Sequence, residues 1–366
     1  MRKIYSSLAA LLLILTSCVD DLYPGTSGPV KLLGMDADLY TTDTLHEVML
    51  YYSGYDSIEY AGDLTVSIYV NGDLRDETSD CRPYYDKTSD YLKYPALYDL
   101  RATFSPGDRV RIVARNEEFR AEAEVEVPPG PSFGRTGYSA GKEVDPVTSA
   151  ESRYLEYNVE VMDSGEGTDY YTVDVFNKKI CIQDDNGNVV ENALDRLELD
   201  VSGEPLLSAS FPSSFDVLSS SSGNSFDNYK YWAFTDNSFT GGSYTLSLRN
   251  YDVWSILPRH AMSSTGYVDE NGHYVMKCLE YTMRLSAEVR LSRVSRAVYS
   301  RYLAKSFENS ALSSLVLFDS THEYPSNVKG GIGMVNVFSS TLREIEIGTF
   351  HYDMYNYHQI EEIYGD

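Results

Sequence analysis

Residues 281–291 read YTMRLSAEVRL, with an apolar side chain at every second position from Tyr281 to Leu291 and a polar or charged one between each pair. Alternation with period two places the two sets on opposite faces of an extended chain. The run therefore predicts a long β-strand with one buried and one wet face, and it is the longest run of its kind in the sequence.

Shorter runs of the same kind lie on both sides of it. Residues 64–70 alternate and lead into Asn71-Gly72, which is typical of a type I′ hairpin turn. Residues 155–161 and 171–175 alternate in the same way. Repeated short strands with turn residues between them predict a mostly β fold.

A further hairpin is predicted between residues 109 and 126. A two-residue turn at Asn116-Glu117 would place Arg111 opposite Glu122 and Arg109 opposite Glu124 on the wet face. Because opposite charges across two strands stabilise a sheet, these arginines indicate structure rather than a basic binding surface.

The organisation predicted is an N-terminal immunoglobulin-like β-sandwich over residues 31–128, followed by a larger β-rich domain over residues 133–366. The boundary is Val127-Pro128-Pro129-Gly130-Pro131, because prolines cannot donate to a sheet ladder. One prominent helix is expected at about residues 292–308, with Ser292 as its N-cap and an apolar stripe against the sheet.

The composition excludes one class of partner. The 366 residues contain 30 Lys and Arg against 55 Asp and Glu, a formal net charge of -25. This charge repels phosphate backbones and no local basic patch offsets it, so no nucleic acid is expected as a partner. No cofactor is expected either.

The amino end predicts the compartment. Arg2 and Lys3 precede an apolar run that ends in small residues before Cys18. This is the layout of a signal peptide over residues 1–17, too short to span a bilayer. Its end resembles the bacterial lipobox, in which Cys18 carries acyl chains such as palmitate. Residues 18–30, rich in Pro, Gly and Ser, are predicted to be a lipidated tether.

Asp20 and Asp21 stand just behind that cysteine. The acidic pair resembles the export signal of lipoproteins in Bacteroidota-type bacteria. The location expected is the outer membrane, with the protein lipid-anchored and facing the cell exterior.

The three other cysteines are Cys81, Cys181 and Cys278. Their spacing excludes a CxxC metal or redox motif. Buried thiols and a single disulfide among the three both remain open.

Short motifs give no catalytic residue and no metal site. Residues 137–141 match the G-x-S-x-G nucleophile elbow, but their flanks are Pro- and Gly-rich rather than a strand and a helix. None of the six histidines has zinc-ligand spacing. Residues 184–188 read DDNGN, which fits a hairpin turn better than a calcium loop of the EF-hand type.

Two groups of side chains are candidates for interaction or modification. Tyr352, Tyr355, Tyr357 and Tyr364 lie at the acidic carboxyl end, where amphipathic rings would suit a ligand surface. Three triplets resemble the short O-glycosylation motif of Bacteroidota-type surface proteins. Their acceptor residues are Thr44, Ser57 and Ser320.

Several segments together resemble a family of Bacteroidota outer-membrane lipoproteins known as domain of unknown function 4249. They are the lipobox at Cys18, the strand 64–72, FSPGD at 104–108 with the boundary at 127–128, FTDNSF at 234–239 with Gly241-Gly242, the helix around 299–306, and PSNVKGGIG at 325–333. The resemblance implies an accessory lipoprotein of a TonB-dependent outer-membrane transporter and carries over no catalytic residue. The glycines at 330–333 are expected to allow close backbone packing or a tight turn.

These observations lead to three hypotheses about function. The first is a non-enzymatic outer-membrane surface lipoprotein that serves as an accessory or ligand-binding subunit of a TonB-dependent nutrient transporter. The alternative is a free-standing adhesin or glycan-binding surface module that uses exposed tyrosines. The third is a hydrolase assembled from distant residues, which would need a cleft with converging carboxylates, histidines or a metal.

Overall fold

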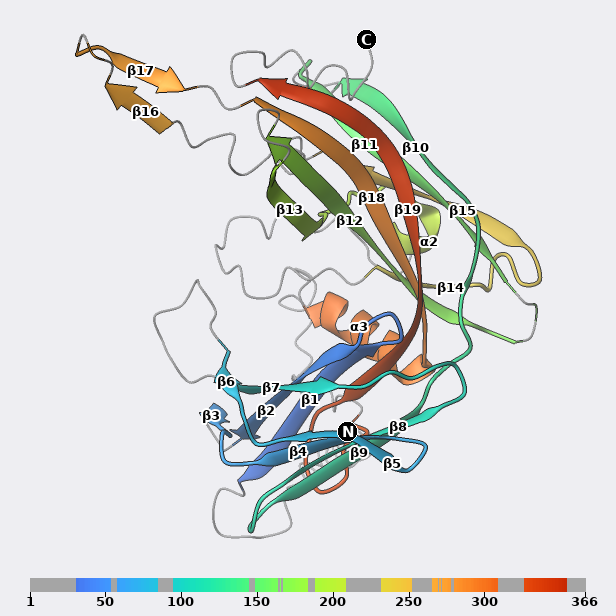
Figure 1. Ribbon diagram of the computed structural model, residues 1–366. Coiled ribbons are helices and arrows are strands. Elements are labelled where there is room, and N and C mark those ends of the chain that lie inside the picture. Colours follow the sequence, from blue (N-terminus) through green and yellow to red (C-terminus); the bar gives the residue numbers. More distant parts are fainter. Residues whose placement is uncertain are drawn as a thin grey trace, which may run out of the picture.

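The computed structural model describes residues 31–53, 58–84, 95–144, 149–163, 165, 167–183, 188–208, 232–251, 265–268, 270, 272–277, 280–308 and 326–353 (Figure 1). These residues are mostly in β-strands, as the sequence predicts. The strands form two tiers, which we call the lower and the upper tier from their places in Figure 1.

The lower tier contains the first nine strands: β1 (Leu32–Tyr40), β2 (Leu45–Ser53), β3 (Ile58–Tyr60), β4 (Thr65–Val70), β5 (Asp73–Thr78), β6 (Arg82–Pro83), β7 (Ala96–Arg101), β8 (Arg109–Arg115) and β9 (Arg120–Glu126). Two sheets face each other here. One has the order β5-β4-β8-β9, and the other contains β1, β2 and β7.

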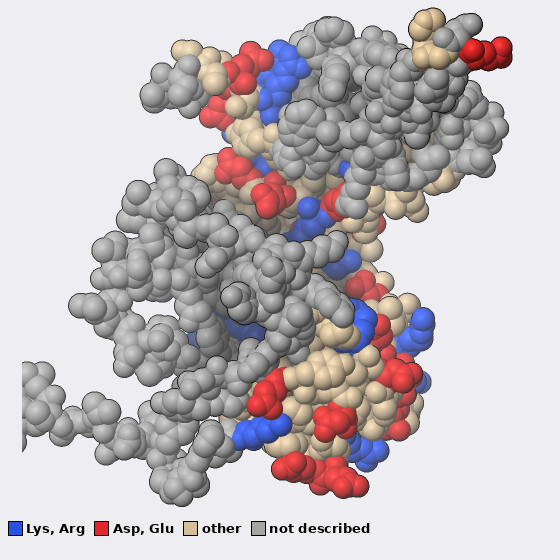
Figure 2. All heavy atoms as spheres, turned by 90° about the vertical axis from the view of Figure 1, so that its left-hand side faces the viewer, with Lys and Arg blue, Asp and Glu red and all other residues tan. Residues whose placement is uncertain are grey.

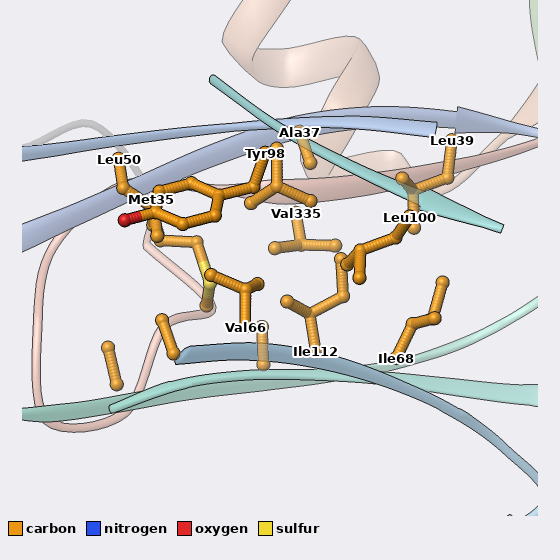
Figure 3. Close-up of a cluster of buried hydrophobic side chains, with 14 of the residues drawn as sticks. Met35, Ala37, Leu39, Leu50, Val66, Ile68, Tyr98, Leu100, Ile112 and Val335 are labelled. Atoms are coloured by element: carbon orange, nitrogen blue, oxygen red, sulfur yellow. The ribbon is translucent and has the colours of Figure 1, made fainter. Parts of the chain in front are cut away.

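Apolar side chains from both sheets fill the space between them (Figure 3). Leu50 and Tyr98 come from one sheet, and Val66, Ile68 and Ile112 come from the other; all are at most 1% exposed. The alternation predicted over residues 64–70 is confirmed, since Leu64, Val66, Ile68 and Val70 are all buried. Truncating one of these side chains to alanine would cost about 2–5 kcal/mol.

The upper tier contains the longest strands together with several shorter ones: β10 (Ser132–Val144), β11 (Glu151–Met162), β12 (Tyr170–Gln183), β13 (Asn188–Arg196), β14 (Ala233–Thr235), β15 (Ser243–Asn250), β18 (Glu280–Val294) and β19 (Val335–Asp353). The sheet β10-β11-β15 packs over the sheet that contains β13-β12-β18-β19. The strand predicted at residues 281–291 is the central part of β18, and Met283, Leu285, Ala287, Val289 and Leu291 are all buried in this core. The remaining elements are the hairpin β16 (Thr265–Val268) and β17 (Tyr274–Lys277), the short helix α2 (Pro205–Ser208) and the helix α3 (Arg296–Glu308).

One sheet runs through both tiers. Its order is β13-β12-β18-β19-β1-β2-β7-β6, because β19 pairs with β1 in parallel at its start and with β18 in antiparallel along its length. Val335 lies opposite Ala37 in the lower tier, and Asp353 lies opposite Glu280 in the upper one. The two regions separated by residues 127–131 therefore share a sheet.

The chain before β19 also closes the lower tier. Lys329 exchanges two backbone hydrogen bonds with Glu122 of β9, and Ile332 bonds to both Leu33 and Met35 of β1. Gly330 and Gly333 have positive φ angles of 76° and 107°. A side chain on either would meet the carbonyl oxygen of the neighbouring strand, so the close packing expected of these glycines is confirmed.

The helix α3 (Arg296–Glu308) begins later than predicted. Ser292 is not its N-cap: it lies in β18, is buried, and its hydroxyl bonds to that of Ser340 at 2.7 Å. The cap is Ser295, whose Oγ accepts from the Val298 N–H at 3.3 Å. Strand pairing of β18 through Arg293 and Val294 accounts for the difference. The apolar stripe packs as expected, with Val298 and Tyr302 buried against Met334 and Phe338.

The hairpin of β8 and β9 has a different register from the one predicted. Arg111 lies opposite Glu124 and Arg109 opposite Glu126, so the pairing is shifted by two residues. The turn takes four residues rather than two, because Asn116 Oδ1 accepts from the N–H groups of Glu118 and Phe119. A shift of two preserves the faces, so the arginines still oppose glutamates.

The turn predicted at Asn71-Gly72 is confirmed, whereas the linker predicted around residues 137–141 is a strand. Asn71 and Gly72 have φ angles of 56° and 90° and join β4 to β5, as a type I′ turn requires. Ser139 of the G-x-S-x-G match lies inside β10 opposite Glu156, and this strand continues to Val144, so the match lacks the strand–turn–helix layout of a nucleophile elbow. The strand starts at Ser132, where the sequence suggested a linker.

Candidate functional site

Three aspartates that are far apart in sequence converge at one end of the upper tier. Asp163 follows β11, Asp169 precedes β12, and Asp236 follows β14. One carboxylate oxygen of each lies within 4.8 Å of those of the other two. We call these three residues the aspartate cluster.

Two loops are joined around Asp163. Its Oδ2 accepts from the backbone N–H of Gly165 at 2.9 Å and from that of Gly241 at 2.6 Å. Both glycines have positive φ, and a Cβ on Gly165 would stand 3.2 Å from the Cα of Gly241. The glycines therefore let the connection after β11 approach the connection after β14 closely.

Asp169 is the member of the cluster with a cation beside it. Its Oδ1 accepts a hydrogen bond from Arg293 of β18, and its Oδ2 accepts from the Tyr171 hydroxyl at 3.3 Å. Burial raises the pKa of Asp169, and Asp163 raises it further, while Arg293 opposes both effects.

Asp236 is 0% exposed. Its Oδ1 accepts from the Asp169 N–H at 3.0 Å, but its buried Oδ2 has no hydrogen-bond donor among the residues that the structure describes. Burial raises the pKa of the Asp236 carboxyl, and the negative charges of Asp163 and Asp169 add to that rise. A buried carboxylate oxygen without a donor is costly, so its presence requires an explanation.

The arrangement can do one of two things chemically. Oxygen ligands at this separation can hold a hard divalent cation, or two carboxyl groups can share a proton. The convergence of carboxylates is also what the hydrolase hypothesis needs. However, a catalytic carboxylate must reach its substrate, and Asp169 and Asp236 are both shielded from solvent.

The sequence motifs did not identify this cluster, because its members belong to two separate connections. The local signals were DSGEGTD at residues 163–169, with two aspartates flanking glycines, and DNS at residues 236–238. Neither has the spacing of a known metal loop. Their proximity depends on how β14 pairs with β12, which places Thr235 opposite Tyr170.

Most residues predicted as sites lie outside the described residues: Cys18, Asp20, Asp21, Ser57, Ser320, Tyr355, Tyr357 and Tyr364. Cys278, whose disulfide state the sequence left open, also lies outside them. Thr44 is described and exposed, just before β2. Tyr352 lies in β19 opposite Tyr281 of β18. None of these residues belongs to the aspartate cluster.

The cysteines and histidines also lie apart from the cluster. Within the described chain Cys81 and Cys181 form no disulfide, and Cys181 is buried, as one of the two readings of these thiols expects. His46 is buried in the lower tier, where its Nε2 lies 3.2 Å from the Ala102 carbonyl oxygen. His273 and His351 are exposed.

The exposed charges are mixed. Figure 2 shows the side of the molecule that is on the left in Figure 1, and on its lower tier acidic and basic side chains are interspersed. Examples of exposed ion pairs are Lys31 with Glu59 and Arg115 with Glu77. In the part of the chain that is described, no helix has the length and apolar character to cross a membrane.

Comparison with known proteins gives little. No protein-family model matches the chain, and no curated protein matches it. Among solved structures, the chain is similar to one titled "Enterococcal surface protein, partial N-terminal region", at 8% identity and a TM-score of 0.15, over 74% of this chain and 93% of that one. The function must therefore be argued from the chain's own residues.

Proposed function

We propose that this protein is a non-enzymatic lipoprotein of the outer membrane surface that serves as an accessory or ligand-binding subunit of a TonB-dependent nutrient transporter. The observation that carries the proposal is the amino-terminal sequence, in which the predicted signal peptide over residues 1–17 is followed by Cys18 and then by Asp20-Asp21. The resemblance to the outer-membrane lipoprotein family supports the transporter association.

The position of the first strand is compatible with such an anchor. β1 starts at Leu32, directly after the predicted tether over residues 18–30, and it lies inside the lower tier. A chain held by acyl groups at Cys18 would thus have the lower tier nearest the membrane and the upper tier farther out. The upper tier, with its long strands, would then be the part presented to a partner.

The alternative is a free-standing adhesin or glycan-binding module. Its support is a pair of exposed tyrosines in the lower tier: Tyr60 is 46% exposed and Tyr84 is 40% exposed. The Tyr60 hydroxyl lies 3.1 Å from the Cys81 sulfur, which places Tyr60 near the strand that leads to Tyr84. Exposed aromatic rings of this kind suit stacking against sugars.

Anchoring is tested first, by intact-mass analysis and membrane fractionation of the protein expressed in a Bacteroidota host. Cys18→Ala is expected to abolish acylation and release the protein from the membrane. The matched control, Cys81→Ala, should leave both unchanged. An unacylated wild-type protein would contradict the proposal.

The partner is tested by purification of the tagged native protein from detergent-solubilised outer membranes. A TonB-dependent transporter should co-purify with it. Repeated recovery of the lipoprotein alone, together with glycan binding that Tyr60→Ala and Tyr84→Ala remove, would favour the alternative.

A further inference from the structure

We infer that Asp163, Asp169 and Asp236 form a binding site for a divalent cation of the oxygen-preferring class, with Ca²⁺ as its occupant. The inference concerns the chemistry of the upper tier and does not depend on the proposed function. It is argued from the burial, the charge and the spacing of the cluster.

The first argument is the buried oxygen of Asp236. The side chain is 0% exposed, and its Oδ2 has no donor among the described residues, although a carboxylate oxygen removed from water normally accepts a hydrogen bond or binds a metal. Its other oxygen is satisfied by the Asp169 N–H. Asp163 and Asp169 place further negative charge close to the Asp236 carboxylate. A cation would satisfy it.

The second argument is the charge balance. Three carboxylates meet here, and Arg293 forms an ion pair with one of the two buried members, Asp169. The other buried member, Asp236, lies beside Asp163 and carries a second negative charge when it is ionised. A divalent cation would neutralise that charge, whereas an uncompensated buried charge would strongly destabilise the fold.

The third argument is the separation of the ligand atoms. The three oxygens lie within 4.8 Å of one another. Calcium binds oxygen at about 2.3–2.6 Å, so ligands on opposite sides of the ion stand up to about 5 Å apart. All three carboxylates can therefore reach one Ca²⁺. Mg²⁺ requires shorter bonds of about 2.0–2.1 Å and a regular octahedron, which fits a spread-out set less well.

The site would connect two sheets. Asp163 directly follows β11 of the three-stranded sheet, while Asp169 precedes β12 and Asp236 follows β14 of the large sheet. The loops already approach through the Gly241 hydrogen bond to Asp163 and the Thr168 hydroxyl bond to Asn237 at 3.1 Å. A bound cation would hold this end of the upper tier together, and without it the three carboxylates would repel one another.

The test uses the purified full-length chain after treatment with EDTA. Isothermal titration with CaCl₂ should detect one site, and about 1–10 mM CaCl₂ should raise Tm by about 2–4 °C. Ionic strength is held constant with NaCl, because any salt reduces repulsion in a chain of net charge -25. MgCl₂ at the same concentration should give a smaller rise.

The key variant is Asp236→Asn, which keeps the oxygen that accepts from the Asp169 N–H. It should lose the calcium-dependent rise in Tm. Without calcium it should be as stable as the wild type or more stable, because a buried charge facing two others has been removed. Asp163→Asn is the second variant and should weaken calcium binding at least tenfold. The matched control is Asp73→Asn, on an exposed strand of the lower tier, which should retain the full response.

Two results would overturn the inference. One is a wild-type protein with no binding heat and no Tm change in CaCl₂. The other is a calcium response in Asp236→Asn equal to that of the wild type. If neither the wild type nor Asp236→Asn responds to CaCl₂, and Asp236→Asn is more stable than the wild type, the cluster holds a shared proton and not a cation.

Discussion

Arg301 of α3 donates a hydrogen bond to Asp36 Oδ1 of β1 at 2.7 Å, across 265 residues of sequence. The same oxygen accepts from the Met334 N–H at 3.0 Å, and Oδ2 accepts from the Tyr51 hydroxyl at 3.2 Å. The two charged side chains are only 14% and 18% exposed. Asp36 therefore connects the helix, the chain entering β19 and the lower tier.

The first prediction concerns this contact. Asp36→Asn should lower the free energy of unfolding by about 1–3 kcal/mol, because it weakens three hydrogen bonds and leaves the largely buried Arg301 without its counter-ion. Urea denaturation followed by circular dichroism measures the change. The control is Glu59→Gln, which breaks the exposed pair with Lys31 and should cost less than about 1 kcal/mol. Equal losses in the two variants would show that burial of the pair does not matter.

The second prediction concerns the glycines that close the lower tier. Gly333→Ala should destabilise the protein by several kcal/mol, since Gly333 has φ 107° and a Cβ there would lie within 3.0 Å of the Met35 carbonyl oxygen. Gly107→Ala is the matched control: φ is 88°, but nothing lies within 4 Å of the added Cβ. It should cost only the backbone strain, about 1–2 kcal/mol. Thermal unfolding of both variants separates strain from steric overlap, and a Gly333→Ala loss no larger than that of Gly107→Ala would refute the overlap.

The third prediction is a pH dependence that arises from His46. Burial lowers the pKa of His46 below its usual 6.5, while the Ala102 carbonyl and Asp43 oppose the shift. As the pH falls through 6.5, the unfolded chain therefore takes up this proton before the folded one does. The stabilising contribution is complete above pH 6.5 and declines as the pH falls towards the lowered pKa.

The measurement is the free energy of unfolding from pH 7.5 down to 5.5. His46→Gln should remove this part of the decline, so the wild type should lose more stability than the variant over that window. His351→Gln, at an exposed position of β19, should leave the decline as it is. Parallel curves for the wild type and His46→Gln would rule out the assignment.

The strands could be predicted from sequence because their signal is local. Period-two alternation at residues 281–291 predicts one buried and one wet face. In the structure the apolar positions from Met283 to Leu291 are buried, and the polar positions between them are partly or fully exposed. Which strand pairs with which is not encoded locally. The parallel pairing of β1 with β19 places Tyr40 opposite Phe338, nearly the whole chain away, and no sequence motif predicts it.

The aspartate cluster could not be predicted from the sequence for the same reason, because its assembly depends on non-local strand pairing. Asp163 and Asp169 are separated by one short connection, but Asp236 arrives only through the pairing of β14 with β12. Motif spacing describes ligands carried by one loop or helix. A site assembled from two connections has no fixed spacing, so only the structure can bring it together.

The last prediction concerns the turn between β8 and β9, which has four residues where the sequence predicts two. Asn116 is positioned to specify four residues, since its Oδ1 accepts from the N–H groups of Glu118 and Phe119 at 2.9 and 2.7 Å. Its Nδ2 also donates to the Tyr52 hydroxyl and to Asp63.

Asn116→Ala should therefore lower the free energy of unfolding by about 1–3 kcal/mol and speed amide hydrogen exchange at the ends of β8 and β9. Glu117→Ala changes an exposed residue of the same turn and should stay within about 0.5 kcal/mol of the wild type. A register shift by two residues preserves the buried face, so burial of apolar side chains does not distinguish the two-residue turn from the four-residue turn. The hydrogen bonds of the Asn116 side chain would then determine the turn length. If Asn116→Ala kept wild-type stability and exchange, the register would have to be set elsewhere in the sheet.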